Sequence, residues 1–101
     1  MAEQEDKRQE IQIEIDEQTG QGVYSNLAMI GHSETEFVLD FIFVQPRAAK
    51  AKVRSRIVTS PAHIKRLMAA LQDNIRRYEE RFGEIKVSSQ PREEKKIGFY
   101  H

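Results

Sequence analysis

The stretch EFVLDFIFV, residues 36–44, decides the fold, because its side chains alternate along nearly the whole length. Odd positions from 37 carry Phe, Leu, Phe and Phe, and even positions from 38 carry Val, Asp, Ile and Val. A period of two with aromatic and β-branched residues is typical of a strand. Pro46 follows, and proline cannot donate to a central ladder. We therefore predict a strand over residues 36–44 with its odd-numbered side chains in the core.

Three further stretches alternate in the same way and are separated by turn sequences. They are IQIEIDE at 11–17, VYSNLAMI at 23–30 and KVRSRIVT at 52–59. Pairing Met29 with Phe37 and Phe43 with Val53 places every core position at an odd number. The sequence thus predicts a four-stranded antiparallel β-meander.

The hydrophobic period changes to about 3.6 after the last strand. Ser60 is placed to cap a helix, Pro61 is tolerated at its first position, and Gly83 is a good stop. Apolar residues follow steps of three and four between them, at Ile64, Leu67, Met68, Leu71, Ile75, Tyr78 and Phe82. We predict an amphipathic helix of about 22 residues on the odd face of the sheet, which makes an α+β fold.

The composition is that of a small soluble domain. The chain has 101 residues, 32% charged and 39% hydrophobic, and its 16 basic residues balance 16 acidic ones. This balance excludes a global field that attracts nucleic acid or anionic membranes. With no cysteine, no signal-peptide pattern and no apolar run of membrane-spanning length, we expect a cytoplasmic protein. The predicted parts are a flexible tail over 1–9, one α+β domain over 10–85 and a flexible tail over 86–101.

The even-numbered face of the predicted sheet has no second helix to cover it, yet it carries many apolar residues. Large exposed apolar patches usually mark contact sites, and two-fold dimers are the commonest assembly. We therefore expect a homodimer or a larger assembly through this face, and pairing at a sheet edge is the alternative. The candidate interface residues are Tyr24, Asn26, Ile30, Val38, Asp40, Ile42, Val44, Arg54, Arg56 and Val58.

A polar row crosses the same face in the predicted register. Asn26, Asp40 and Arg56 are expected side by side on adjacent strands. The row is interpreted as an ion pair with a hydrogen-bonding neighbour that fixes the alignment of strands and of a dimer. A polar pocket for a ligand is the alternative interpretation.

A basic stripe runs through residues 49–58, where Lys50, Lys52, Arg54 and Arg56 occupy every second position. Such a stripe can bind phosphates, and nucleic acid is therefore the alternative partner. Neighbouring charges about 6.6 Å apart repel only weakly in water, so the stripe also exists without a ligand.

The remaining candidates for chemistry are weak. His32, His63 and His101 match no metal-binding spacing, and Ser60 beside His63 is better explained as a helix cap than as a nucleophile with its base. Gly20 and Gly22 lack the helix and lysine of a phosphate loop. We expect no catalytic residue, no cofactor and no metal, and hence no enzyme.

Two stretches resemble a known family. These are YSNLAMIGHSETEFVLDFIF and AKVRSRIVTSPAHIKRLMAALQDNIRRYEERFGEI, whose most specific parts are residues 36–41 and Ser60 with Pro61 and the helix after them. Over about residues 23–85 the chain is similar to a bacterial family of small proteins, domain of unknown function 3467. The resemblance implies a single real domain and no known activity or cofactor.

Overall fold

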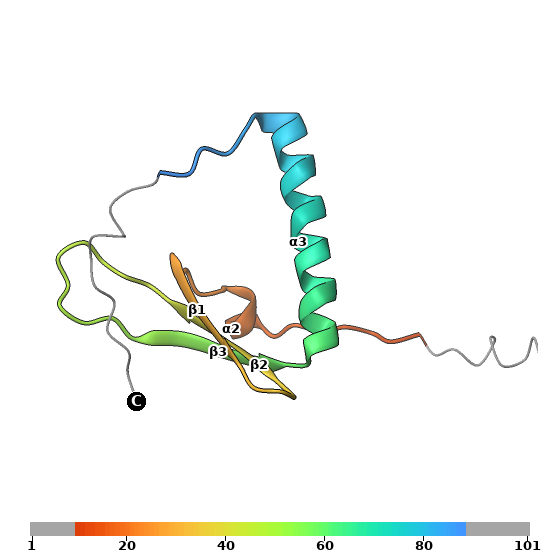
Figure 1. The fold of residues 1–101 in the computed structure, drawn as a ribbon, viewed down its shortest axis with the longest axis horizontal. Helices are drawn as coiled ribbons and strands as arrows, with labels where there is room; N and C mark the ends of the chain where they lie inside the picture. The colour runs from red at the N-terminus through yellow and green to blue at the C-terminus, as the bar shows by residue number, and fades with distance from the viewer. Residues whose placement is uncertain (1–9, 89–101) are drawn as a thin grey trace, which may run out of the picture. The chain divides into compact units, whose positions relative to one another are not determined.

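The computed structural model describes residues 10–88. Along the chain these form α2 (Glu17–Gly20), β1 (Leu27–His32), β2 (Phe37–Ile42), β3 (Val53–Thr59) and α3 (Pro61–Phe82), as Figure 1 shows. This confirms an α+β fold with an antiparallel sheet and a C-terminal helix.

The chain divides into two units, one up to Val58 and one from Thr59 onwards, and each is described by itself. One domain over 10–85 and a helix packed on the sheet stay predictions. The predicted tail over 1–9, and the part of the other tail over 89–101, lie outside the described residues.

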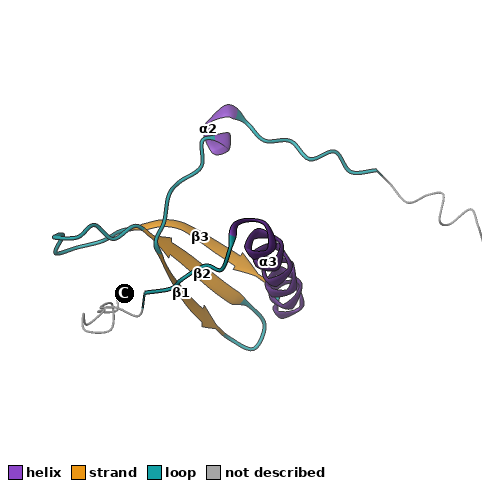
Figure 2. Cartoon of the chain, turned by 90° about the horizontal axis from the view of Figure 1, so that it is seen from above, coloured by secondary structure: helices purple, strands orange, loops and turns teal. Residues whose placement is uncertain are grey.

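The sheet has three strands in the order β1-β2-β3, so β2 is central and the other two are edges (Figure 2). The prediction of a fourth strand within residues 11–17 was wrong. This segment joins no strand of the described chain, and Ile11, Ile13 and Ile15 are 81%, 92% and 69% exposed. Alternation makes a segment able to form a strand, but a strand also needs a neighbour for its backbone groups.

The register between β1 and β2 also differs from the prediction. Leu27 lies opposite Ile42, Met29 opposite Asp40, and His32 opposite Phe37. Met29 had been expected opposite Phe37, so the register is shifted by three residues. Because side chains alternate between faces, an odd shift moves every side chain of one strand to the other face relative to its neighbour.

The turn between these strands causes the shift. The Ser33 amide donates to the Glu36 carbonyl oxygen at 2.9 Å, and the Ser33 hydroxyl oxygen accepts from the amides of Thr35 and Glu36, each at 3.2 Å. The reversal therefore needs only residues 33–36. Gly31, which follows the strand predicted over 23–30, instead continues β1 opposite Val38.

The central strand β2 carries the buried residues of the sheet. Leu39 and Ile42 are 7% and 5% exposed and, at odd and even positions, lie on opposite faces. Asp40 is 4% exposed and shares the face of Ile42. Both faces of the sheet therefore have a buried centre.

The helix α3 begins and ends where the sequence predicts. The Ser60 hydroxyl oxygen accepts from the His63 amide at 3.1 Å, Pro61 is the first helical residue, and Gly83 follows Phe82 with a φ of 102°. These two ends are encoded locally, because a hydroxyl cap and a positive φ at glycine need no partner from elsewhere in the fold.

Candidate functional site

The most distinctive side-chain arrangement of the sheet is an ion pair between β2 and β3. Arg56 Nε donates to Asp40 Oδ1 at 2.7 Å, and Arg56 Nη2 donates to Asp40 Oδ2 at 2.8 Å. The Asp40 side chain is 6% exposed, whereas that of Arg56 is 56% exposed. The predicted neighbourhood of these two residues is thus present, as a two-pronged contact between a buried carboxylate and a guanidinium open to water.

Asn26 does not join this pair, so the predicted row of three polar residues was wrong at that position. Its side-chain amide donates to the Val44 carbonyl oxygen at 3.0 Å, and its side-chain oxygen accepts from the Val44 amide at 2.8 Å. Asn26 therefore extends the pairing of β1 with β2 just before β1 begins. The residue that lies opposite Asp40 on β1 is Met29.

The register divides the predicted interface between two faces. Asp40 and Arg56 mark one of them, and alternation along each strand assigns the other members. We call this surface the Asp40 face; it consists of Leu27, Met29, Val38, Asp40, Ile42, Arg54, Arg56 and Val58.

Two predicted interface residues belong elsewhere. Ile30 lies opposite Leu39, on the other side of the sheet, and the rings of Tyr24 and Phe43 meet edge to face with centroids 5.7 Å apart. Val44 follows β2 and is held by Asn26. Sequence reasoning missed Leu27 and Met29 as members of the Asp40 face, because it assigned them to the core. The short turn that Ser33 and Glu36 close was the sequence signal that could have assigned Leu27 and Met29 to the Asp40 face.

The four residues of the basic stripe do not all lie in one strand. Arg56 engages Asp40, and Lys50 and Lys52 precede β3 in the connection from β2. Lys50, Lys52 and Arg54 do line a shared open hollow together with Phe43 and neighbouring residues of the connection. The sequence predicted the Phe43 ring in the core, whereas in the structure this ring lines the hollow together with the three cations.

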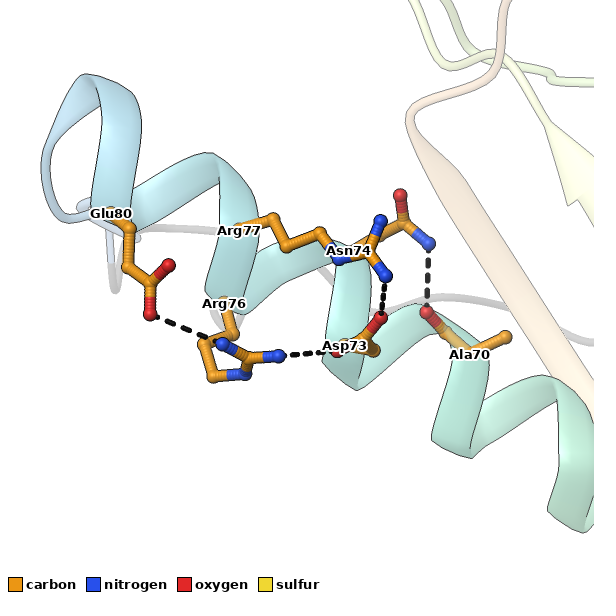
Figure 3. Close-up of polar contacts among 6 residues, drawn as sticks. All are labelled: Ala70, Asp73, Asn74, Arg76, Arg77 and Glu80. Atoms are coloured by element: carbon orange, nitrogen blue, oxygen red, sulfur yellow. Dashed lines mark hydrogen bonds and ion pairs between the residues drawn. The ribbon is translucent and has the colours of Figure 1, made fainter.

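The polar side of α3 carries several ion pairs (Figure 3). Arg76 contacts Asp73 at 2.6 Å and Glu80 at 3.1 Å, while Arg77 contacts Asp73 at 2.8 Å. Hydrogen bonds from Arg76 to Asp73 and then to Glu80 raise the pKa of that guanidinium. Such pairs three and four residues apart are typical of a solvated helix face.

The histidines have ordinary surroundings. His32 stacks on Phe37 with centroids 5.3 Å apart, His63 is bound at its amide by the Ser60 cap, and His101 lies outside the described residues. Across residues 10–88 no three His, Cys, Asp or Glu side chains gather in a way that could hold a metal ion. In the same part of the chain no helix is long and apolar enough to cross a membrane.

The fold and the site define a class of protein: a small α+β protein with a three-stranded antiparallel sheet and a long amphipathic helix, marked by an ion pair on the sheet between Arg56 and the buried carboxylate of Asp40. The chain belongs to the family described as protein of unknown function (DUF3467), which it matches over residues 1–87. The match is longer than the resemblance over 23–85 and includes the segment at 11–15. Searches of curated proteins and of solved structures found no match.

Proposed function

We propose that this protein is an interaction module that acts by association, and that its first partner is a second copy bound through the Asp40 face. The observation that carries the proposal is a sheet face on which the buried carboxylate of Asp40 pairs with Arg56 beside apolar side chains. Asp40 is 4% exposed, and its neighbours on that face include Met29, which is partly exposed, and Val58, which is 51% exposed. Apolar surface supplies the driving force for association, and a desolvated ion pair can fix the alignment of two copies.

The strand arrangement supports a contact on one face. Central strand β2 has apolar side chains on both sides, such as Leu39 on one and Ile42 on the other. Among the described residues only α3 is a helix long enough to cover a sheet face. One helix covers at most one of two faces, so a further partner is expected for the other.

The charges of the Asp40 face favour a second copy as that partner. Alternation places Asp40 on β2, with Glu36 in the turn just before this strand as a flanking acidic residue, and Arg54 and Arg56 on β3. A two-fold axis parallel to the strands and midway between β2 and β3 sets the basic line of each copy over the acidic line of the other. Two-fold dimers need such self-complementary surfaces.

Val58 and Ile57 provide a matched test of the face. They are adjacent in β3, they are 51% and 48% exposed, and they point to opposite faces. We expect the full chain to sediment at twice its monomer mass of 11.8 kDa at micromolar concentration. Val58→Glu is expected to weaken the dimer at least about tenfold, which corresponds to about 1.4 kcal/mol, because it places a charge in the contact.

Ile57→Glu is the control and should leave the dimer intact, with far-UV circular dichroism showing that both variants keep their secondary structure. A wild-type protein that stays monomeric at about 100 μM, well above ordinary dimer constants, contradicts the proposal. Equal weakening by both variants contradicts the assignment to the Asp40 face.

Nucleic acid is a second candidate partner, supported by the hollow that Lys50, Lys52 and Arg54 line with Phe43. Cations bind phosphates and aromatic rings stack with bases in single-strand binding sites. This function predicts binding to a single-stranded oligonucleotide that falls steeply with salt. Lys50→Gln with Lys52→Gln should weaken it, whereas Lys65→Gln with Arg66→Gln removes two charges from α3 and should not. Equal loss in the two double variants rejects a specific site.

A further inference from the structure

The segment at residues 11–15 has the side chains of a strand but pairs with no strand of the described chain. Its three isoleucines alternate with Gln12 and Glu14. The segment is drawn as a loop rather than a strand in Figure 2, and Ile13 is 92% exposed. Three exposed isoleucines are unfavourable in water, at about 1.5–3 kcal/mol each relative to burial. The family match over 1–87 includes the segment.

The open edge of β1 is suited to accept such a strand. Ser33 and Glu36 form a hydrogen-bonded pair, and bonded and non-bonded positions alternate along antiparallel strands. The backbone groups of Ala28, Ile30 and His32 therefore point away from β2, toward the open edge.

The side chains of β1 leave this edge unprotected. β1 has the sequence LAMIGH and contains no Lys, Arg, Asp, Glu or Pro. Edge strands are usually protected by charged side chains, and β3 at the opposite edge carries Arg54 and Arg56. Since Ile30 on β1 is also 62% exposed, the β1 edge is the better acceptor for an added strand.

We infer that residues 11–15 of one copy pair antiparallel with β1 of a second copy, so that each sheet of the dimer gains a fourth strand. This inference rests on the dimer of the proposed function and specifies how its copies exchange segments. Ile13 lies opposite Ile30, Ile11 opposite His32 and Ile15 opposite Ala28. This register uses all three outward-facing residues of β1 and forms up to about six hydrogen bonds. It also places the isoleucines beside the exposed Ile30.

The length of the connection allows the exchange. Residues 16–26 join the segment to β1, and α2 takes up part of them, capped by the Asp16 side chain at Thr19. With helical and extended rises the connection spans at most about 30 Å. Stacked sheets lie about 10 Å apart, and a three-stranded sheet is about 10 Å wide. The segment thus reaches the β1 edge of a stacked partner.

Cysteine pairs test the inference cleanly, because the chain has no cysteine of its own. In the inferred register Glu14 lies opposite Met29 at a non-bonded position, where the Cα atoms are about 4.5 Å apart and a disulfide can form. A mixture of Glu14→Cys and Met29→Cys chains should form a mixed disulfide under mild oxidation, identified by mass spectrometry of the linked peptides. The control mixture of Ile13→Cys and Met29→Cys places the thiols on opposite faces and should link at least about tenfold less.

The double variant with Glu14→Cys and Met29→Cys in one chain distinguishes whether residues 11–15 at a β1 edge come from the same chain or from the second copy. Linkage between chains supports exchange, whereas a disulfide that closes within one chain shows that the segment binds its own edge and overturns the inference. Absence of the mixed disulfide also overturns it.

Sedimentation of the wild-type chain distinguishes a failure of the strand exchange from a failure of the proposed dimer. A wild-type dimer without the mixed disulfide leaves the Asp40 face contact standing and removes only the exchange. A wild-type monomer removes both.

Discussion

Replacing Arg56 with alanine removes both hydrogen bonds that reach Asp40 from β3, at 2.7 Å and 2.8 Å, and leaves the carboxylate on a face where it is 4% exposed. Losing one partner of a fully buried ion pair costs about 3–5 kcal/mol of stability. Because the Arg56 side chain is 56% exposed, water already screens the pair, and we expect a smaller loss of about 2 kcal/mol. Arg56→Lys keeps the charge without the two-pronged geometry and should lose about 1 kcal/mol.

Urea unfolding followed by far-UV circular dichroism measures these losses. All variants are compared at one protein concentration, since self-association makes apparent stability depend on concentration. Asp40→Asn, alone and combined with Arg56→Ala, completes a double-mutant cycle, and we expect a coupling energy of about 1–2 kcal/mol. Asp40→Asn should cost less in the Arg56→Ala background, because the carboxylate has already lost the Arg56 guanidinium there.

Arg54→Ala is the matched control. Arg54 belongs to the same strand and face as Arg56, but it forms no ion pair with residues 10–88. Its replacement should change the free energy of unfolding by less than about 0.5 kcal/mol. If Arg56→Ala is no more destabilising than this control, the reasoning from the buried carboxylate is refuted.

Three further predictions concern the ends of helices. Ser60→Ala removes the hydroxyl that accepts from the His63 amide and should lower the free energy of unfolding by about 1 kcal/mol, with Ser60→Asp close to wild type in the same urea assay. Gly83→Ala places a Cβ at a φ of 102° and should cost about 1 kcal/mol, whereas an unchanged midpoint contradicts a strained helix end. The hydrogen bond from Thr19 lowers the pKa of Asp16, so capping of α2 persists above the unfolded pKa of about 4 and is lost as the pH falls through the folded value. The Thr19 amide shift in NMR should follow this titration, and Asp16→Asn should abolish its pH dependence.

Local signals were the part of the fold that the sequence predicted best. Ser60, Pro61 and Gly83 fixed α3 as Pro61–Phe82, because caps and a positive φ act over a few residues. The neighbourhood of Asp40 and Arg56 was also predicted, as the Arg56 contact shows.

Interactions between strands were predicted less well, since they depend on turns and neighbours. The Ser33 side chain closes a shorter turn than the predicted strand ends at 30 and 36 imply, and that moved the register by three residues. Residues 11–15 have the alternation of a strand, but alternation does not say which edge, or which chain, supplies the partner.

The corrected register changes what the Asp40 face can do. In the predicted register Asp40 stood between Asn26 and Arg56, a row of polar atoms suited to a ligand pocket. In the structure Asp40 lies between Met29 and Arg56, and Asn26 binds the Val44 backbone instead. The Met29 thioether, in place of the Asn26 amide, removes a strong hydrogen-bond donor and a strong acceptor from the row. The local polarity is therefore lower, and this strengthens the attraction between Arg56 and Asp40. Met29 also adapts its shape to an apposed surface. These properties favour a contact with another protein surface over a pocket for a polar ligand.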